Sequence, residues 1–545
     1  MNLCKQCKVE FEVTDQDLKF YNKIDVPEPT LCPDCRCQRR WAWRDKNFYL
    51  RNCDKCNEKA MSWFSPDIKD VQTYCESCYR SDDFDATENG RDFDFGPKVR
   101  PFFEQFHELL KVTPRHISNA VQNENSEYII CAHKNKNCFF CDELDGCWDC
   151  YYGYNIQYCK NVVETIFIRD SEICYDTAKA ENCYNVFYSK NVFNCSDSAF
   201  LLNCRGCKNC LFSANLRNKE HHIFNKPVSK EEFEKTWHEI FDGSRETLEK
   251  NHEKYEKFLK DQPHPAALII NCEDSTGDYL SNCKNVKDSF WIDNSRDCRY
   301  CSDIHYSKDC YDVNIYEGEL MYESIHVGPK GYGQFFTQLG WFSQNLYYCI
   351  EMHGSQDCFG CVSLKKKKYC ILNKQYSREK YEELRDRIIE HMKKTGEYGE
   401  FFPIEMSPYP YNQTMAQRFY PLTKEEALAK GWEWMDEKEE ITEEAEKEIP
   451  ENINNLPSDI TSRIYKCSKS DKKFRYTEPE IAFYKKYQIP LPMLSPIERI
   501  ERLWKRMGPR KLQDRKCEKC NVDIKTAHSN KEKLYCEKCY LEEAY

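Results

Sequence analysis

Cysteine pairs at Cys-x-x-Cys spacing constrain this chain more than any other feature. The sequence holds 35 cysteines in 545 residues. In a secreted protein so many cysteines would predict disulfides, whereas reduced thiols paired at this spacing predict zinc. No apolar run approaches the roughly 18 residues that span a bilayer, and the pair in MNLCKQC stands where a signal peptide would begin. We therefore expect a cytoplasmic protein that makes no membrane contact.

The cysteine pairs near the two ends combine into candidate zinc sites. A knuckle turn presents two thiolates to one metal, and two knuckles complete a closed tetrahedral shell. A closed shell has no open position for water or substrate, so we predict structural Zn²⁺, about three ions per chain. The predicted ligands form three sets: Cys4, Cys7, Cys32 and Cys35; Cys53, Cys56, Cys75 and Cys78; Cys517, Cys520, Cys536 and Cys539.

The two ends of the chain are copies of each other. LCKQCKVEFEVTDQDLKFYNKIDVPEPTL at 3–31 aligns with KCSKSDKKFRYTEPEIAFYKKYQIPLPML at 466–494. So many identities in one register are unexpected by chance. In the C-terminal copy the first zinc site has decayed and leaves Cys467 alone. Three of its four ligands are replaced, by Ser470, Ser495 and Glu498.

The segment from about 126 to 374 has a different character, with short β-branched and aromatic runs between Asn-Cys pairs. A steady step between cysteines predicts a parallel β-helix, in which like residues stack from coil to coil, Asn takes the tight corners and Cys fills the core. The cysteines form two series whose sequence numbers rise by either 21 or 24 at each step: Cys138, Cys159, Cys183 and Cys204, and Cys150, Cys174 and Cys195.

This predicted solenoid is itself duplicated. CKNVVETIFIRDSEIC at 159–174 resembles CKNVKDSFWIDNSRDC at 283–298, and each half ends in a helix, near 229–260 and 377–395, that begins at a capping serine. The second half is longer by about 21 positions, roughly one predicted coil. The cysteine-free, aromatic segment 318–346 is either this inserted coil or a functional loop.

The fold class that follows is mainly β. We predict a duplicated parallel β-helix-like solenoid with helical spacers, flanked by duplicated zinc-ribbon modules at both termini. The predicted domains are a double zinc-ribbon module at 1–80, an acidic and helical connector at 81–125, solenoid half 1 at 126–225, a helical spacer at 226–265, solenoid half 2 at 266–374, a helical segment at 375–435, an acidic linker at 436–458, and a C-terminal zinc-ribbon module at 459–545 with one degenerate site.

A further metal site is conceivable inside the solenoid. Two more Cys-x-x-Cys pairs lie close together there, although the stretch that connects them is short for a ribbon. The alternative is that these thiols are stacked core residues. The four cysteines are Cys138, Cys141, Cys147 and Cys150.

The combination of these features resembles a group of cysteine-rich, zinc-ribbon-containing proteins of candidate-phylum bacteria. The likeness covers most of the chain and implies this architecture, but it implies no activity. The segments that carry it are LCPDCRCQRRWAWRDK at 31–46, FDFGPKVRPFFEQFHELL at 93–110, NSEY at 125–128, NCYNV at 182–186 and FYKKYQIPLP at 483–492.

Enzyme motifs are missing from the sequence. There is no GxSxG, Walker-type or GxGxxG motif, and no His-Glu pair continues as a metalloprotease helix requires. A β-helix carbohydrate-active enzyme remains an alternative, although no carboxylate pair stands out. The sequence therefore leaves the question of catalysis open, favours its absence, and predicts no catalytic residue.

Two basic segments with tryptophans occupy matched places in the terminal copies. Arginine and aromatic rings together can grip phosphates and stack bases, which makes RNA or ribosome binding one hypothesis. The alternative is that the arginines pair with acidic neighbours of a small domain. The main hypothesis is a non-catalytic scaffold with an unnamed protein partner, because solenoids offer long, stiff surfaces. The candidate nucleic-acid contacts are Arg36, Arg39, Arg40, Arg44, Arg502, Arg506 and Arg510.

Overall fold

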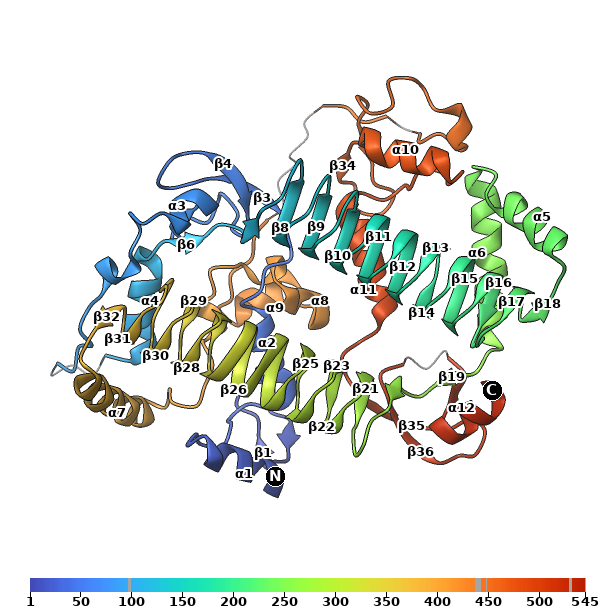
Figure 1. Cartoon of the computed structure of the whole chain (residues 1–545). Coiled ribbons are helices and arrows are strands. Elements are labelled where there is room, and N and C mark those ends of the chain that lie inside the picture. The colour runs from blue at the N-terminus through green and yellow to red at the C-terminus, as the bar shows by residue number, and fades with distance from the viewer. Residues whose placement is uncertain (97–99, 437–442, 447, 529–531, 545) are drawn as a thin grey trace.

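Two large parallel sheets form the body of the protein and lie side by side (Figure 1). The computed structural model describes residues 1–96, 100–436, 443–446, 448–528 and 532–544. Part of the predicted acidic linker, 437–442 and 447, lies outside the described residues. The structure is mainly strand, as predicted.

The first sheet follows the N-terminal module and ends in an antiparallel pair. Its strands are β7 (Ala120–Val121), β8 (Glu127–His133), β9 (Phe139–Asp145), β10 (Tyr151–Gln157), β11 (Lys160–Arg169), β12 (Glu172–Glu181), β13 (Tyr184–Phe187), β14 (Lys190–Phe193), β15 (Ser196–Arg205), β16 (Lys208–Ala214), β17 (Glu220–Ile223) and β18 (Lys226–Pro227).

The second sheet has the same plan and also ends in an antiparallel pair. Its strands are β20 (Ile269–Ile270), β21 (Gly277–Ser281), β22 (Lys284–Lys287), β23 (Ser289–Asp293), β24 (Arg296–Arg299), β25 (Ser302–His305), β26 (Lys308–Phe335), β27 (Gln338–Trp341), β28 (Gln344–Tyr347), β29 (Ile350–His353), β30 (Gln356–Phe359), β31 (Lys368–Ile371) and β32 (Lys374–Gln375).

Stacked strands pair at an offset of 12 positions in the first sheet and in most of the second, where β20 pairs with β21 at an offset of 11. This offset corrects the predicted step of 21 or 24. Tyr151 pairs with Val163, Val163 with Tyr175, and Tyr175 with Phe187. The prediction was wrong because its cysteine series joined residues on different sides of the winding chain. The additional length of the second half is therefore not one coil. Segment 318–346 continues the second sheet through the end of β26 and into β28.

The backbone turns at every third residue. From Asn119 to Phe224, each third residue has a positive φ, and most of these residues are not glycine. Left-handed backbone costs an ordinary residue about 1–2 kcal/mol, and Asn and Asp tolerate it best. The predicted corner role of Asn is confirmed at all six Asn-Cys pairs: Asn137, Asn182, Asn194, Asn203, Asn271 and Asn282.

Corner side chains bond to each other across neighbouring strands. The Asn137 Nδ2 donates to Asp149 Oδ1 at 3.0 Å, and the Asn345 Nδ2 donates to Asp357 Oδ1 at 2.8 Å. The residue after each of these corners points inward, where Cys138 and its equivalents are buried. In each three-residue repeat, one residue therefore lies in the core, one lies at a corner and one lies on the wall between them.

Helices cap the ends of the sheets and fill the terminal modules. The predicted capping serines are confirmed, since Ser229 accepts from Glu232 N–H and Ser377 from Lys380 N–H. The predicted helix at 229–260 is split into two. The helices are α1 (Asp15–Lys23), α2 (Pro33–Trp41), α3 (Glu76–Arg80), α4 (Phe102–Val112), α5 (Lys230–Ile240), α6 (Arg245–Lys260), α7 (Arg378–Thr395), α8 (Met415–Phe419), α9 (Lys424–Ala429), α10 (Glu478–Lys486), α11 (Pro496–Met507) and α12 (Glu537–Ala544), with 3₁₀ turns at Ala86–Asn89, Ile404–Met406, Tyr411–Gln413 and Ile453–Asn455.

The remaining strands are short, and most form hairpins in the terminal modules. They pair as six two-stranded sheets. Their bounds are β1 (Asn2–Leu3), β2 (Glu10–Phe11), β3 (Tyr49–Asn52), β4 (Lys59–Ser62), β5 (Thr73–Tyr74), β6 (Arg115–His116), β19 (His264–Pro265), β33 (Tyr465–Lys466), β34 (Lys473–Phe474), β35 (Gln513–Lys516), β36 (Asp523–Thr526) and β37 (Leu534–Tyr535).

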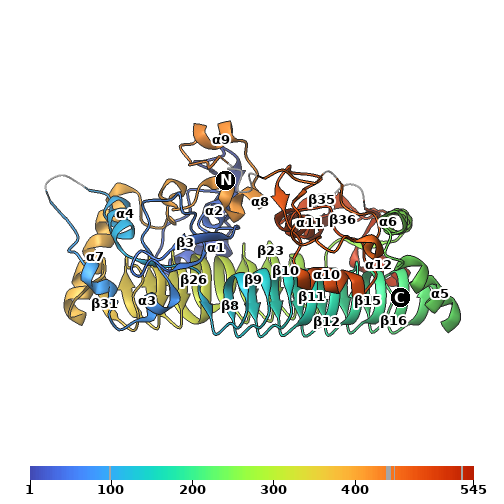
Figure 2. The same ribbon diagram turned by 90° about the horizontal axis from the view of Figure 1, so that it is seen from above.

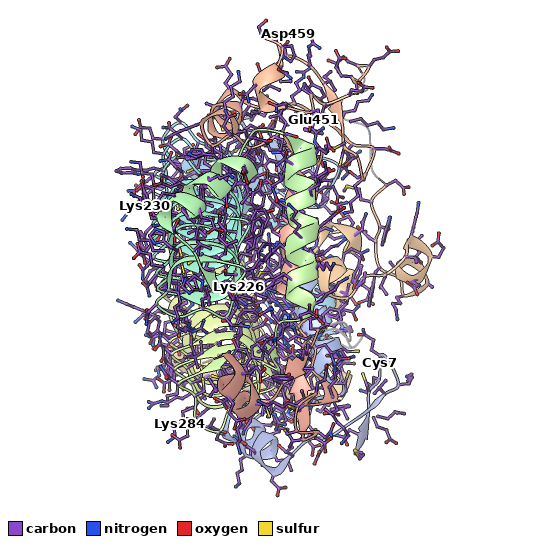
Figure 3. All side chains as sticks on the ribbon, turned by 90° about the vertical axis from the view of Figure 1, so that its right-hand side faces the viewer. Cys7, Lys226, Lys230, Lys284, Glu451 and Asp459 are labelled. Atoms are coloured by element: carbon purple, nitrogen blue, oxygen red, sulfur yellow. The ribbon has the colours of Figure 1, made fainter. Side chains whose placement is uncertain are left out.

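Much of the terminal modules, including α2 and α11, lies on one side of the two sheets (Figure 2). The end view in Figure 3 agrees, with Lys226, Lys230 and Lys284 on the sheet side and Cys7 on the opposite side. None of the helices in the described ranges is long and apolar enough to cross a membrane.

Candidate metal centres

Each Cys-x-x-Cys knuckle is a short hairpin that turns two cysteines toward the same point. In the first knuckle, Cys4 N–H donates to Val9 O at 3.0 Å, and Lys8, directly after the second cysteine, has φ 62°. The knuckles that begin the other two sets also carry a left-handed residue at this place, Asn57 and Asn521. The Cys-x-x-Cys sequence thus forms the same turn three times.

The structure brings each predicted set of four cysteines together. In every set the four sulfur atoms all lie within 4.8 Å of one another. The first set joins the hairpin of β1 and β2 to the start of α2, and the others are built in the same way with α3 and α12. The three groups, found among the residues with described positions, are Cys4–Cys7–Cys32–Cys35, Cys53–Cys56–Cys75–Cys78 and Cys517–Cys520–Cys536–Cys539.

The sulfur spacing fits a tetrahedral zinc centre. A Zn–S bond of about 2.3 Å places two sulfurs of a regular tetrahedron about 3.8 Å apart. The second cysteine of one knuckle lies 3.7 Å, sulfur to sulfur, from the first cysteine of the other in all three groups: Cys7 to Cys32, Cys56 to Cys75 and Cys520 to Cys536. Four thiols at this spacing, with no nitrogen or oxygen ligand, are the donor set of a closed structural site.

Backbone amides support the thiolate form of the first cysteine in each group. Cys75 N–H donates to the Cys53 sulfur at 3.2 Å, and Cys536 N–H donates to the Cys517 sulfur at 3.3 Å. Burial alone would raise the pKa of Cys517, but hydrogen bonds from backbone N–H groups outweigh it and lower this pKa to about 6. A thiolate is the form that binds metal.

The fourth knuckle keeps its backbone without its ligands. Cys467 N–H donates to Lys472 O at 2.8 Å, and Asp471 has the left-handed φ of 55° seen at the equivalent place in the other knuckles. The charged residue at the last ligand position, Glu498, forms an ion pair with Lys469. Three of the four ligand positions therefore carry no thiol, and the glutamate at one of them is held in an ion pair.

The cysteines of the predicted additional site are core residues. The Cys138 thiol donates to the Cys147 carbonyl at 3.5 Å, and the Cys141 thiol donates to the Cys150 carbonyl at 3.7 Å. All four thiols are buried, and within the described ranges they do not form a group with metal-binding spacing. Thiols that donate to carbonyls satisfy the backbone at these turns.

The arginines of the N-terminal copy lie inside the protein. The Arg36 guanidinium is 2.8 Å from Asp312, and Arg40 is 3.2 Å from Asp312 and 3.0 Å from Glu323. Arg39 lies between Glu323 at 2.9 Å and Glu400 at 2.6 Å. These arginines follow Cys32 and Cys35 along α2, so the helix carries them from the cysteine cluster to the second sheet.

Arg44 reaches the first sheet instead. Its Nη2 is 3.0 Å from Asp142, and its Nη1 is 2.7 Å from Asp45. The neighbouring tryptophans, Trp41 and Trp43, are fully buried.

The arginines of the C-terminal copy mirror this arrangement. On α11, Arg502 is 2.9 Å from Glu164 and 3.2 Å from Asp176, and Arg506 also pairs with Asp176. Arg510 pairs with Asp303 of the second sheet. The exposed fractions of the Arg502 and Arg506 side chains are 39% and 29%, so these two remain partly accessible.

The N-terminal module packs on the second sheet, and the C-terminal module packs on the first. Helix α2 of the N-terminal module packs on β26 of the second sheet, and α11 of the C-terminal module packs on β10, β11 and β12 of the first (Figure 1). The sequence analysis missed the acidic partners on the sheets. Five of them, Glu164, Asp176, Asp303, Asp312 and Glu323, are left-handed corner residues. Acidic residues that recur once per coil would have indicated these partners, but the length of a coil was not known from the sequence.

No protein-family model and no curated protein matches the chain.

Proposed function

We propose that the chain is a non-catalytic, structural zinc-binding scaffold that presents its surface to a protein partner. The observation that carries the proposal is the sulfur geometry, in which three closed sets of four thiols have the spacing of zinc–thiolate centres. A closed shell offers no position to a substrate. The metal then contributes folding free energy to its module.

In this proposal zinc holds the arginine helix in place. Cys32 is the N-cap of α2, and Cys35 lies in its first turn, so the metal would fix the start of the helix that carries Arg36 and Arg40. In the C-terminal copy the pair between Lys469 and Glu498 substitutes for the metal at the start of α11. Each helix in turn ties its module to a sheet.

We interpret the two sheets as the duplicated β-helix-like solenoid of the prediction, with a new coil beginning every 12 positions. In the first sheet, the constant register and the left-handed residue at every third position support this interpretation. A stack of this kind is a stiff, elongated body whose wall residues vary without changing the core. The predicted domain boundaries are part of the same proposal.

RNA or ribosome binding remains the alternative function. The burial of Arg36, Arg39, Arg40 and Arg44 against carboxylates weighs against it, because a guanidinium that is paired inside the protein cannot also contact phosphate. The partly exposed Arg502 and Arg506 are the residues that favour it. A carbohydrate-active enzyme remains a third hypothesis.

Metal analysis of the purified, reduced protein tests the zinc part. We expect about three zinc ions per chain by elemental mass spectrometry, one for each closed set. A value near zero in metal-replete protein would overturn the proposal, and a value of four would return attention to the solenoid thiols.

A pull-down from native lysate tests the scaffold part. The tagged full chain is incubated with and without nuclease, and bound protein and RNA are identified. A protein that is retained after nuclease treatment, and lost when zinc is removed by chelation, supports a scaffold. Loss of all bound material on nuclease treatment would favour the RNA hypothesis instead.

A further inference from the structure

A cavity of about 360 Å³ lies between the two sheets, and Arg80, two residues after Cys78, contributes to its rim. Its volume is within the range of small-molecule sites, roughly 300–1,000 Å³. Both sheets contribute to its wall. The lining residues that matter most for the argument are Cys131, His133, Glu143, Asp145, Trp341 and His353.

Two polar columns from the first sheet form one side of the cavity. His133, Asp145 and Gln157 are register partners on β8, β9 and β10, so they stand one above another at the strand spacing of about 4.8 Å. In the adjacent column, Glu143 and Asn155 are left-handed corner residues. The first sheet therefore offers carboxylates and amides in two parallel rows.

Cys131 begins the second of these columns and differs from the other cysteines. Among the described cysteines it alone has a positive φ, of 47°, which places it at a corner instead of in the core. Its sulfur lies 3.9 Å from His326 Nε2 and 4.0 Å from Arg44 Nη2. Because Cys131 lies at a corner and faces the other sheet, its thiol is not part of the stacked core. It lines the cavity instead.

Aromatic side chains of the second sheet form the opposite side. Trp341 and His353 are register partners on β27 and β29, with ring centres 4.6 Å apart. Tyr316 stacks on His326 at 5.3 Å. Here the second sheet departs from its regular winding, because Ile325 pairs with Gln338, one position beyond the usual offset. One additional residue in one of two paired strands commonly changes the direction of the side chains beside a functional site.

The charges in the cavity favour a cation. Glu143 already lies 3.5 Å from the Arg44 guanidinium, whereas Asp145 accepts a hydrogen bond from the neutral Tyr158 hydroxyl at 3.3 Å. Arg80, the cation at the rim, is paired with Glu76. Burial lowers the pKa of His133 and lowers that of His353 to about 3, so both imidazoles are neutral near pH 7.

We propose that this cavity binds a small organic cation, an amine with a flat apolar body, whose ammonium group meets Asp145 and whose body lies against Trp341. Carboxylates supply the charge, and the face of a tryptophan attracts a cation and stacks with flat groups. The inference goes beyond the scaffold role and does not depend on zinc.

Calorimetric titration of the zinc-loaded full chain with three probes of one shape tests the proposal. Phenethylamine is the cation, phenethyl alcohol the neutral probe and phenylacetate the anion. We expect phenethylamine to bind about tenfold or more tightly than either of the others, the difference a desolvated charge contact provides. Equal binding of the three probes, or no binding of phenethylamine at millimolar concentration, would overturn the proposal without any variant.

Two variants then locate the site. Asp145→Asn removes the charge at constant shape, and Asp293→Asn is its control, since Asp293 also closes a strand directly before a left-handed residue but is not among the cavity residues. We expect Asp145→Asn to weaken phenethylamine binding about tenfold and Asp293→Asn to leave it unchanged. Equal effects of the two substitutions would contradict the assignment.

Discussion

Removal of the Arg40 charge should destabilise the docking of the N-terminal module. The cluster on α2 is balanced, with three guanidinium groups and three carboxylates: Arg36, Arg39 and Arg40 with Asp312, Glu323 and Glu400. The side chains of Arg40, Asp312 and Glu323 are 0% exposed. Arg40→Met leaves one buried carboxylate without its cation, and breaking a buried pair in this way costs about 3–5 kcal/mol.

The double variant Arg40→Met, Asp312→Leu restores the balance to two charges of each sign. Replacing both partners of a buried ion pair by apolar residues is often close to neutral, so we expect this variant to recover much of the loss. Arg296→Met is the control, because Arg296 is exposed on the second sheet.

Hydrogen exchange and thermal unfolding provide the assay. Exchange of α2 amides reports local opening of the docked module, and we expect faster exchange in Arg40→Met, a lower unfolding midpoint and wild-type behaviour in the control. RNA binding is measured in parallel at two salt concentrations. If Arg40→Met kept wild-type exchange and stability while losing RNA affinity, the structural role of this arginine would be refuted.

Two further predictions concern the knuckles and a buried acid. Cys517→Ser should lose about one zinc ion and unfold the C-terminal module, whereas Cys467→Ser, in the knuckle without ligands, should keep the full metal content by elemental analysis; equal losses would show that the ligands are misassigned. Burial raises the pKa of Asp45 to about 7 despite the opposing charge of Arg44, so the folded protein holds this proton more tightly than the unfolded chain. Its contribution to stability is present below about pH 4 and is lost as pH rises through 7. Asp45→Asn should therefore gain stability relative to wild type as pH rises from about 4 to 7, by at most about 4 kcal/mol in total, in urea titrations; a constant difference across that range would contradict the shifted pKa.

Local sequence was sufficient for the zinc knuckles and helix caps. A Cys-x-x-Cys turn is formed by neighbouring residues, so spacing alone identified the twelve thiols that the structure groups into three sets. Ser229 and Ser377 cap helices through the residues that directly follow them. The alignment of the two ends likewise needed only the sequence, and Thr14 and Thr477 form the same capping box in both copies.

The winding of the sheets was only partly visible in the sequence. Asn at the corners and Cys in the core were predicted, because each is a property of one residue and its φ. The coil length was not, since a residue in the core can repeat at any multiple of three and the cysteine series crossed from one side of the coil to another. Only the hydrogen bonds between strands fix the length of a coil.

Tertiary structure alone decided what the charged residues do. Arg40 and Glu323 are far apart in sequence, and nothing local distinguishes an arginine that binds phosphate from one that meets a buried carboxylate. The crosswise docking of the modules makes that choice, because it removes both groups from water and leaves each as the other's partner. The packing of one sheet against the other also places Cys131, whose position the sequence did not distinguish from that of the other cysteines, in the wall of a cavity.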